Sequence, residues 1–162
     1  MGADIHAYPE YTEATRTGWS GFGRMSLPRD YDMFAKLAGV RGDNQMIPLR
    51  GVPVDACMTT RWDNQLYVSE DDPDNDGNCS PSAAERWVSD GSSQWVDDRK
   101  QQVTHPDWHS HSYCSPAELR AVIEAEREIN WSVDVRYWAV LAMLEEIERR
   151  GGSSRLVYWF DN

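Results

Sequence analysis

The clearest hydrophobic pattern lies in the carboxyl-terminal third of the chain. Apolar residues recur there every three or four positions, at Val133, Tyr137, Val140, Leu141, Leu144 and Ile147. This spacing fits the 3.6-residue period of a helix that buries one face, and it predicts a helix from Val133 to Arg150. Gly151 and Gly152 follow this stretch and are expected to end the helix.

The residues just upstream carry the start signal of another helix. Ser115-Pro116-Ala117-Glu118 has the form of a capping box, in which the Ser115 hydroxyl and the Glu118 carboxylate each bind a free backbone N–H. We therefore expect a helix from Pro116 to about Glu128. Beyond the two glycines, residues 156–160 are a dense run of strand formers and predict a final strand.

The amino-terminal part has a weaker pattern. Residues 3–13 alternate loosely between apolar and polar, and the glycines within residues 18–23 favour a turn back, so these stretches predict a pair of strands. Residues 31–38 show helical spacing, and Gly39 can end that helix.

The middle of the chain is rich in turn formers. Prolines and glycines between residues 41 and 62 indicate irregular backbone with a helical turn at residues 55–60. Residues 70–82 are acidic and turn-rich, and residues 63–100 as a whole give only weak signals for a helix at 83–88 and a strand at 94–96. We interpret this stretch as a lid or an inserted loop region on the main domain.

Together these elements predict one α+β domain over residues 1–162. Its expected form is a small mixed sheet with two C-terminal helices packed on it and irregular loops. A chain of 162 residues with 40% hydrophobic residues has the size of a single domain with its own core.

Composition narrows the classes of partner. The formal net charge of −11 disfavours direct binding to nucleic acid, which draws on Lys and Arg. Apolar runs fall short of the roughly 18 residues that span a bilayer, so no membrane association is expected. The cysteines Cys57, Cys79 and Cys114 are odd in number and form no CxxC pair, which is typical of neither a disulfide framework nor a zinc knuckle. The sequence leaves the oligomeric state open.

The four histidines occur in two short segments, one at the amino terminus and one two-thirds of the way along the chain. Asp4-Ile5-His6 opens the chain, and the second segment, which begins at His105, contains Asp107-Trp108-His109-Ser110-His111. Alternate residues of a strand face the same way, so we expect these aspartates and histidines to converge in one pocket. Arg50 is expected nearby, Trp108 in the wall, and the tail Asp161-Asn162 at the border.

The second segment also comes immediately before the capped helix at Pro116. Free backbone N–H groups and the helix dipole favour an anion at such a place. The structural alternative is a polar loop in which Asp107, His109, Ser110 and Ser112 only bind one another.

An acidic loop provides a weaker candidate. Residues 72–77 place carboxylates and a glycine like the opening of a calcium loop, but the closing bidentate carboxylate is missing because Ala83 stands there. We therefore interpret the loop as solvated.

Several phrases resemble a family of small bacteriophage proteins of unestablished function. They are the opening Met1-Gly2-Ala3-Asp4-Ile5-His6, residues 29–41, residues 48–53, the stretch from Asp107 to Ser112 and the closing Phe160-Asp161-Asn162. Residues 63–100 take no part in the resemblance. It implies a phage accessory protein in the host bacterial cytoplasm and supplies no mechanism. By analogy with other small phage proteins, it suggests counter-defence against a nucleotide signal.

Three functional hypotheses follow. The leading one is binding of a small anionic, nucleotide-like ligand by Asp4, His6, Arg50, Asp107, Trp108, His109 and His111, as a counter-defence sponge. The second is a phosphoester hydrolase that depends on a divalent metal, with His6, His109 and His111 as candidate ligands. The third is an acidic inhibitor that mimics nucleic acid. Whether the protein is an enzyme stays open at this point.

Overall fold

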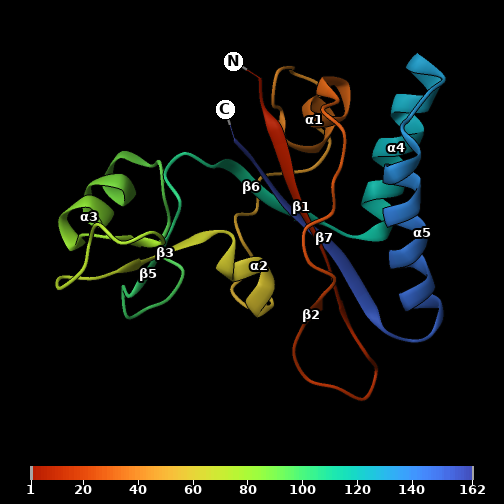
Figure 1. Ribbon diagram of the computed structural model, residues 1–162. Coiled ribbons are helices and arrows are strands. Elements are labelled where there is room, and N and C mark those ends of the chain that lie inside the picture. The colour runs from red at the N-terminus through yellow and green to blue at the C-terminus, as the bar shows by residue number, and fades with distance from the viewer. Residues whose placement is uncertain (1, 162) are drawn as a thin grey trace.

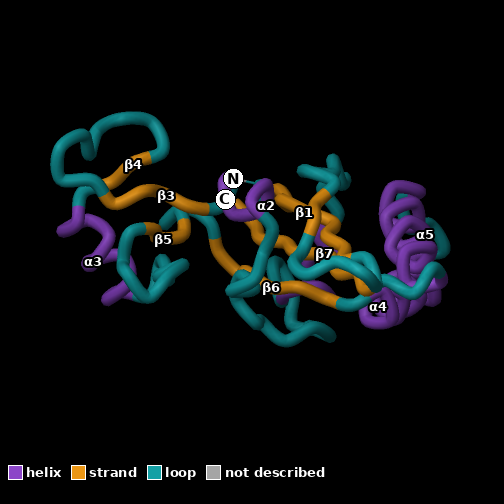
Figure 2. Tube along the Cα trace, turned by 90° about the horizontal axis from the view of Figure 1, so that it is seen from below, coloured by secondary structure: helices purple, strands orange, loops and turns teal. Residues whose placement is uncertain are grey.

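The computed structural model describes residues 2–161 and confirms the α+β class. Within these residues the chain forms five helices and two sheets (Figure 1). The four-stranded sheet lies in the middle, with helices α4 and α5 on one side and a small lobe on the other (Figure 2). No helix among residues 2–161 has the length and apolar character needed to cross a bilayer.

The large sheet has the strand order β2-β1-β7-β6 and is antiparallel throughout. Its strands are β1 (Asp4–Thr12), β2 (Ser20–Gly21), β6 (His109–Cys114) and β7 (Ser153–Asp161). The first and last strands pair over nine residues, from Asp4 opposite Asp161 to Thr12 opposite Ser153. The two ends of the chain therefore form the centre of this sheet.

One face of the large sheet forms the main hydrophobic core. Ile5 and Ala7 of β1 and Leu156, Tyr158 and Phe160 of β7 are buried there. Three helices cover them: α1 (Tyr31–Ala38), α4 (Pro116–Asn130) and α5 (Val135–Arg149). Their apolar stripes supply the other half of the core, as the helical spacing predicted.

The helix ends follow the signals in the sequence with small shifts. The capping box at Ser115 and Glu118 is present at the start of α4. Helix α5 begins at Val135 rather than Val133, because the Asp134 carboxylate accepts a hydrogen bond from the Arg136 backbone N–H and caps the helix there. Gly39 ends α1 in the left-handed conformation, with φ of 69°.

Residues 65–104 fold into a small lobe with a core of its own. The lobe consists of β3 (Gln65–Val68), β4 (Asn78–Cys79), α3 (Pro81–Asp90) and β5 (Gln102–Thr104), in the sheet order β4-β3-β5. Cys79, Ala84 and Val103 are buried between its helix and sheet. The stretch expected as a lid or inserted loops is thus a folded unit.

Two elements of this lobe differ from the prediction. Helix α3 is longer than the predicted 83–88, because the Ser80 hydroxyl accepts a hydrogen bond from the Ala83 N–H and Pro81 begins the first turn. The predicted strand at 94–96 is absent, and Trp95 makes only an isolated bridge to Val103.

A buried ion pair attaches helix α2 (Met58–Trp62) to the other face of the large sheet. Glu10 of β1 is fully buried, and its Oε1 accepts hydrogen bonds from the Cys57 backbone N–H at 2.8 Å and the Thr60 hydroxyl at 2.6 Å. Its Oε2 accepts from Arg155 Nε at 2.8 Å. The carboxylate thereby joins both central strands to the start of α2.

We predict that Glu10→Ala destabilises the protein by about 3–5 kcal/mol, because it leaves Arg155 buried without its main partner. Denaturation with urea measures this change. The matched control is Glu13→Ala, which removes an exposed pair with Arg16 and should cost less than about 1 kcal/mol. Equal losses in the two variants would contradict a structural role for the buried carboxylate.

Candidate functional site

The face of the sheet opposite the main core is lined by aromatic and polar side chains. Trp159 of β7 lies at its centre and is fully buried. Tyr8 stacks on its ring at a centroid distance of 4.7 Å, His6 at 5.8 Å and His111 at 5.9 Å, while Trp108 lies at 5.6 Å. This cluster joins β1, β6 and β7 to the loop that leads from β5 into β6.

The imidazole of His6 is held on three sides. Its Nε2 lies 2.7 Å from Asp161 Oδ2, and Asp161 Oδ1 accepts a hydrogen bond from the Asp4 backbone N–H at 3.0 Å. Trp108 and Trp159 contact the ring, with centroid distances of 5.1 and 5.8 Å. Because an ionised carboxylate only accepts hydrogen bonds, this contact assigns the hydrogen of the neutral imidazole to Nε2 and the lone pair to Nδ1.

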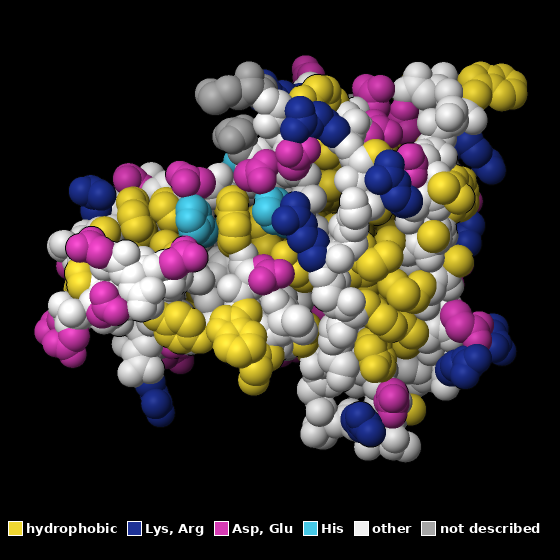
Figure 3. Space-filling model, viewed as in Figure 1, with side chains coloured by type: hydrophobic (Ala, Val, Ile, Leu, Met, Phe, Trp, Pro, Cys, Tyr) yellow, Lys and Arg dark blue, Asp and Glu magenta, His cyan; other side chains and the backbone are white. Residues whose placement is uncertain are grey.

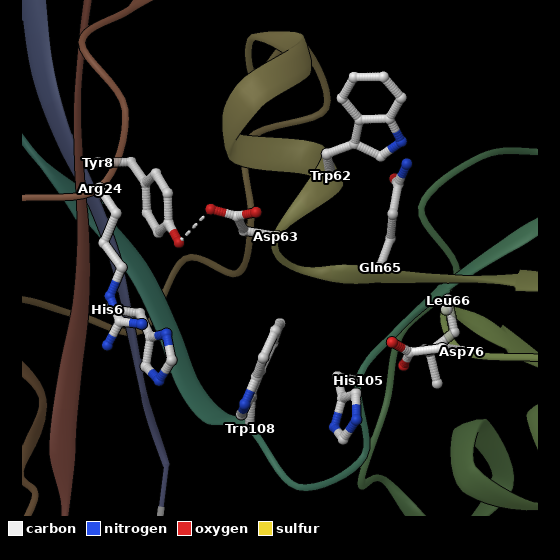
Figure 4. A pocket seen from close by; sticks show the side chains of 11 residues that line it. His6, Tyr8, Arg24, Trp62, Asp63, Gln65, Leu66, Asp76, His105 and Trp108 are labelled. Atoms are coloured by element: carbon white, nitrogen blue, oxygen red, sulfur yellow. Dashed lines mark hydrogen bonds between the residues drawn. The ribbon is translucent and has the colours of Figure 1, made fainter.

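A cavity of about 440 Å³ opens beside His6, between the large sheet and the small lobe. Figure 4 shows its side chains reaching inward from both parts. They are His6 and Tyr8 of β1, Arg24, Trp62 and Asp63 at the end of α2, Gln65 and Leu66 of β3, Asp76, His105 and Trp108. On the molecular surface, histidine and hydrophobic side chains lie together between the two parts, with a basic side chain beside them and acidic ones around (Figure 3).

Charges of both signs line this cavity. Arg24 is exposed, and within residues 2–161 it has no ion pair to a carboxylate. Its guanidinium acts electrostatically on Asp4 and Tyr8, the neighbours of His6 on β1. The Tyr8 hydroxyl donates to Asp63 Oδ2 at 2.8 Å, and burial together with this bond raises the pKa of Tyr8. Tyr8 is therefore a hydrogen-bond donor at neutral pH.

The structure places Asp4 and Arg50 apart from this cavity. Arg29 binds both carboxylate oxygens of Asp4, at 2.8 and 2.7 Å. Arg50 is paired with Glu118 at the start of α4, and this hydrogen bond lowers the pKa of Glu118 to about 2. The expected convergence of both residues with the histidines is thus not observed, because each has a closer partner of opposite charge.

His109 and His111 do not share one face of β6 as their spacing predicted. The pairing of β6 with β7 shifts register between His109 and Ser112, and Ser110 adopts a positive φ of 55°. The His109 ring consequently lies by Phe160, at 6.3 Å, whereas His111 stacks on Trp159. A bulge of this kind redirects side chains that strict alternation would align.

Both histidines nevertheless border a smaller cavity of about 240 Å³, and Trp108 lines both this cavity and the larger one. His109 Nδ1 lies 2.9 Å from the Ser110 hydroxyl, as the structural alternative expected for this loop. His109 Nε2 is buried and has no hydrogen-bond partner among residues 2–161. Asp107 points to solvent, with 85% of its side chain exposed, and Asn162 lies outside the described residues.

Several lining residues were missed by the sequence analysis. His105 belongs to the second histidine segment and stacks on Trp108 at 4.7 Å, so the segment itself could have indicated it. Asp76 belongs to the acidic loop 72–77, which the sequence analysis interpreted as solvated and which the structure places at the cavity. Arg24 lies in a loop and Asp63 at the end of α2, and no local pattern indicated either of them.

His6, His109 and His111 are not placed as a ligand set for a metal ion. Within residues 2–161, no group of three or more His, Cys, Asp or Glu side chains is arranged to hold one.

Comparisons with protein-family models, curated proteins and solved structures gave no match to this chain. The resemblance to bacteriophage proteins therefore stays a prediction.

We predict a stability change with pH that depends on His111. Burial, helped by His109 and His6, lowers the pKa of His111 to about 4, and its Nε2–H donates to Asn64 Oδ1 at 2.9 Å. The unfolded chain binds a proton near pH 6.5 and the folded chain only near pH 4, so stability is full above this window and falls as the pH drops through it. The expected loss between pH 7 and pH 5 is about 2 kcal/mol.

Urea denaturation at pH 7 and pH 5 measures this loss. His111→Gln keeps a donor for Asn64 but does not titrate, so its stability should change by about 2 kcal/mol less over the same interval. Identical pH dependence in the two proteins would show that His111 is not the group responsible.

Proposed function

We propose that this protein binds a small anionic, nucleotide-like ligand in the cavity between the large sheet and the small lobe. The observation that carries the proposal is that Arg24, which has no ion pair among residues 2–161, lies in one concave site with the indoles of Trp62 and Trp108. A phage accessory role, as a sponge for a nucleotide signal, is part of the proposal and draws only on the resemblance described above.

The size and lining of the cavity suit such a ligand. Its volume of about 440 Å³ lies within the range of small-molecule sites. Trp62 is 62% exposed at the rim and presents ring surface on which a base could stack. Trp108 stacks against His105 and Trp159 and forms part of the apolar wall.

The polar groups divide into donors for a phosphate and partners for a base or sugar. Arg24 can bind phosphate oxygens through paired N–H groups. Gln65 and Asp76 line the opposite part of the cavity, and Asp63 lies between them and Arg24, beside Tyr8 (Figure 4). These carboxylate and amide groups can bind ribose hydroxyls or amino groups of a base. The arrangement favours a ligand with a planar group and one anionic group.

The two alternatives receive less support. A metal-dependent hydrolase needs a set of ligands, and no such set exists among residues 2–161. A mimic of nucleic acid needs a stripe of carboxylates on a convex surface, whereas the residues singled out here line a hollow.

The decisive experiment is calorimetric titration of the purified protein with a panel of cyclic and ADP-ribose-derived nucleotides. At least one should bind, and Arg24→Gln should weaken that binding by about 10- to 100-fold, because it removes charge-assisted hydrogen bonds. Trp62→Ala should weaken it by about tenfold or more through lost stacking.

Matched controls are available on the surface. Arg16→Gln changes an exposed arginine outside the cavity, and Trp131→Ala removes an indole that is 90% exposed at the end of α4. Both should leave the affinity unchanged. If no nucleotide of the panel binds, or if Arg24→Gln and Arg16→Gln have the same effect, the proposal is wrong.

A further inference from the structure

The pairing of His6 with Asp161 is not explained by ligand binding alone. A residue that only binds a nucleotide needs no carboxylate behind it, and an imidazole that only fills a core needs no open edge. His6 has both, because Asp161 binds its Nε2 and the ring lines the cavity.

The geometry points to His6 as a general base that activates water for hydrolysis of a phosphoester or phosphoanhydride bond in the bound nucleotide, with Asp161 as its positioning residue. This inference rests on the proposed function, since it takes its substrate from the same cavity. It assigns that cavity a reaction as well as a ligand.

The first argument concerns the protonation state of the ring. Asp161 can only accept a hydrogen bond, so it selects the tautomer with hydrogen on Nε2 and leaves the lone pair on Nδ1. Within residues 2–161 no hydrogen bond joins Nδ1 to a protein group, and Nδ1 does not belong to the fully buried unpartnered atoms. The ring itself lines the cavity (Figure 4). A lone pair that faces a ligand cavity can accept a proton from water.

The second argument concerns rigidity. Trp108 and Trp159 contact the ring of His6, and Asp161 is itself fixed by the backbone N–H of Asp4. The imidazole is thus oriented before any ligand arrives. Such preorganisation is what a general base requires, because loss of its alignment raises the barrier to proton transfer.

The third argument concerns the side chains that lie beside His6, the general base. Arg24 lines the same part of the cavity and acts on both strand neighbours of His6, so a phosphate bound to this guanidinium would lie near Nδ1. Trp62 and Gln65 stand across the cavity (Figure 4). The reacting group would therefore be the phosphate, and the base of the nucleotide would be held away from the histidine.

The step balances as follows. Water gives one proton to His6 Nδ1 while its oxygen forms a new bond to phosphorus, and the bond from phosphorus to the leaving oxygen breaks with its electron pair. The leaving oxygen takes the proton back from His6, so the products are a phosphate monoester or phosphate and a free hydroxyl or phosphate group. Asp161 stabilises the imidazolium between these events.

The test uses the full chain with thymidine 5′-(p-nitrophenyl phosphate) and the same nucleotide panel, in the presence of EDTA. We expect release of nitrophenolate or of a nucleotide product by the wild type. His6→Gln and Asp161→Asn should lower kcat by about 100-fold or more, with little change in KM, because a general base acts on the transition state. Imidazole in solution should partly restore activity to His6→Ala.

The matched control is Glu145→Gln. Glu145 is a partly exposed carboxylate like Asp161, but it pairs with Arg120 between α4 and α5, on the other side of the sheet from the cavity, so its loss should leave kcat unchanged. Thermal unfolding and calorimetric binding are measured on every variant. If His6→Gln does not fold, Asp161→Asn with Glu145→Gln decides the question.

The outcomes separate this inference from the proposed function. Binding without turnover of any panel member or of the chromogenic ester would overturn the inference and leave the binding proposal intact. Turnover that EDTA abolishes, or that persists in both His6→Gln and Asp161→Asn, would also overturn it. Absence of binding and of turnover would overturn both.

Discussion

The pairing of β1 with β7 is the constraint on which the rest of the structure depends. Nine residues from each end of the chain form one antiparallel ladder, and both faces of that ladder are covered. Since side chains alternate along a strand, the pairing presents an apolar set to α1, α4 and α5 and a polar and aromatic set to the opposite face. His6 and Asp161 are 155 positions apart in sequence and meet only through this ladder.

The polar face is stabilised by bringing a partner to each buried polar group of β1. Glu10 binds Arg155 and the start of α2, Tyr8 binds Asp63 at the end of α2, and His6 binds Asp161. A buried polar or charged group without a partner costs several kcal/mol, so these contacts hold α2 against the sheet. Asp63 and Asn64 lead directly into β3, and the same contacts therefore determine where the small lobe lies and how wide the cavity opens.

Parts of the site were predictable, and the parts that failed did so for identifiable reasons. The histidine segments predicted side chains that lie close together, since three of those histidines and Trp108 surround Trp159 or line the cavity beside it. The alignment of His109 with His111 failed at a bulge, which alternation cannot anticipate. Arg50 was expected at the site, but it pairs with Glu118, which is 68 positions away in the sequence, and no local pattern could predict this contact. Arg24 was not expected there.

The sequence by itself determined the α+β class, the capping box of α4, the stop of α1 at Gly39 and the apolar stripe of α5. These features rest on interactions within about four residues along the chain, which are encoded where they occur. Only the tertiary structure decided the small lobe, whose strands of two to four residues are too short to show a period, and the partners of His6, Glu10 and Arg24. The lobe and these partners depend on contacts between distant segments. Many pairings of charged and aromatic residues satisfy the same local pattern, and the shared core and the β1–β7 register select among them.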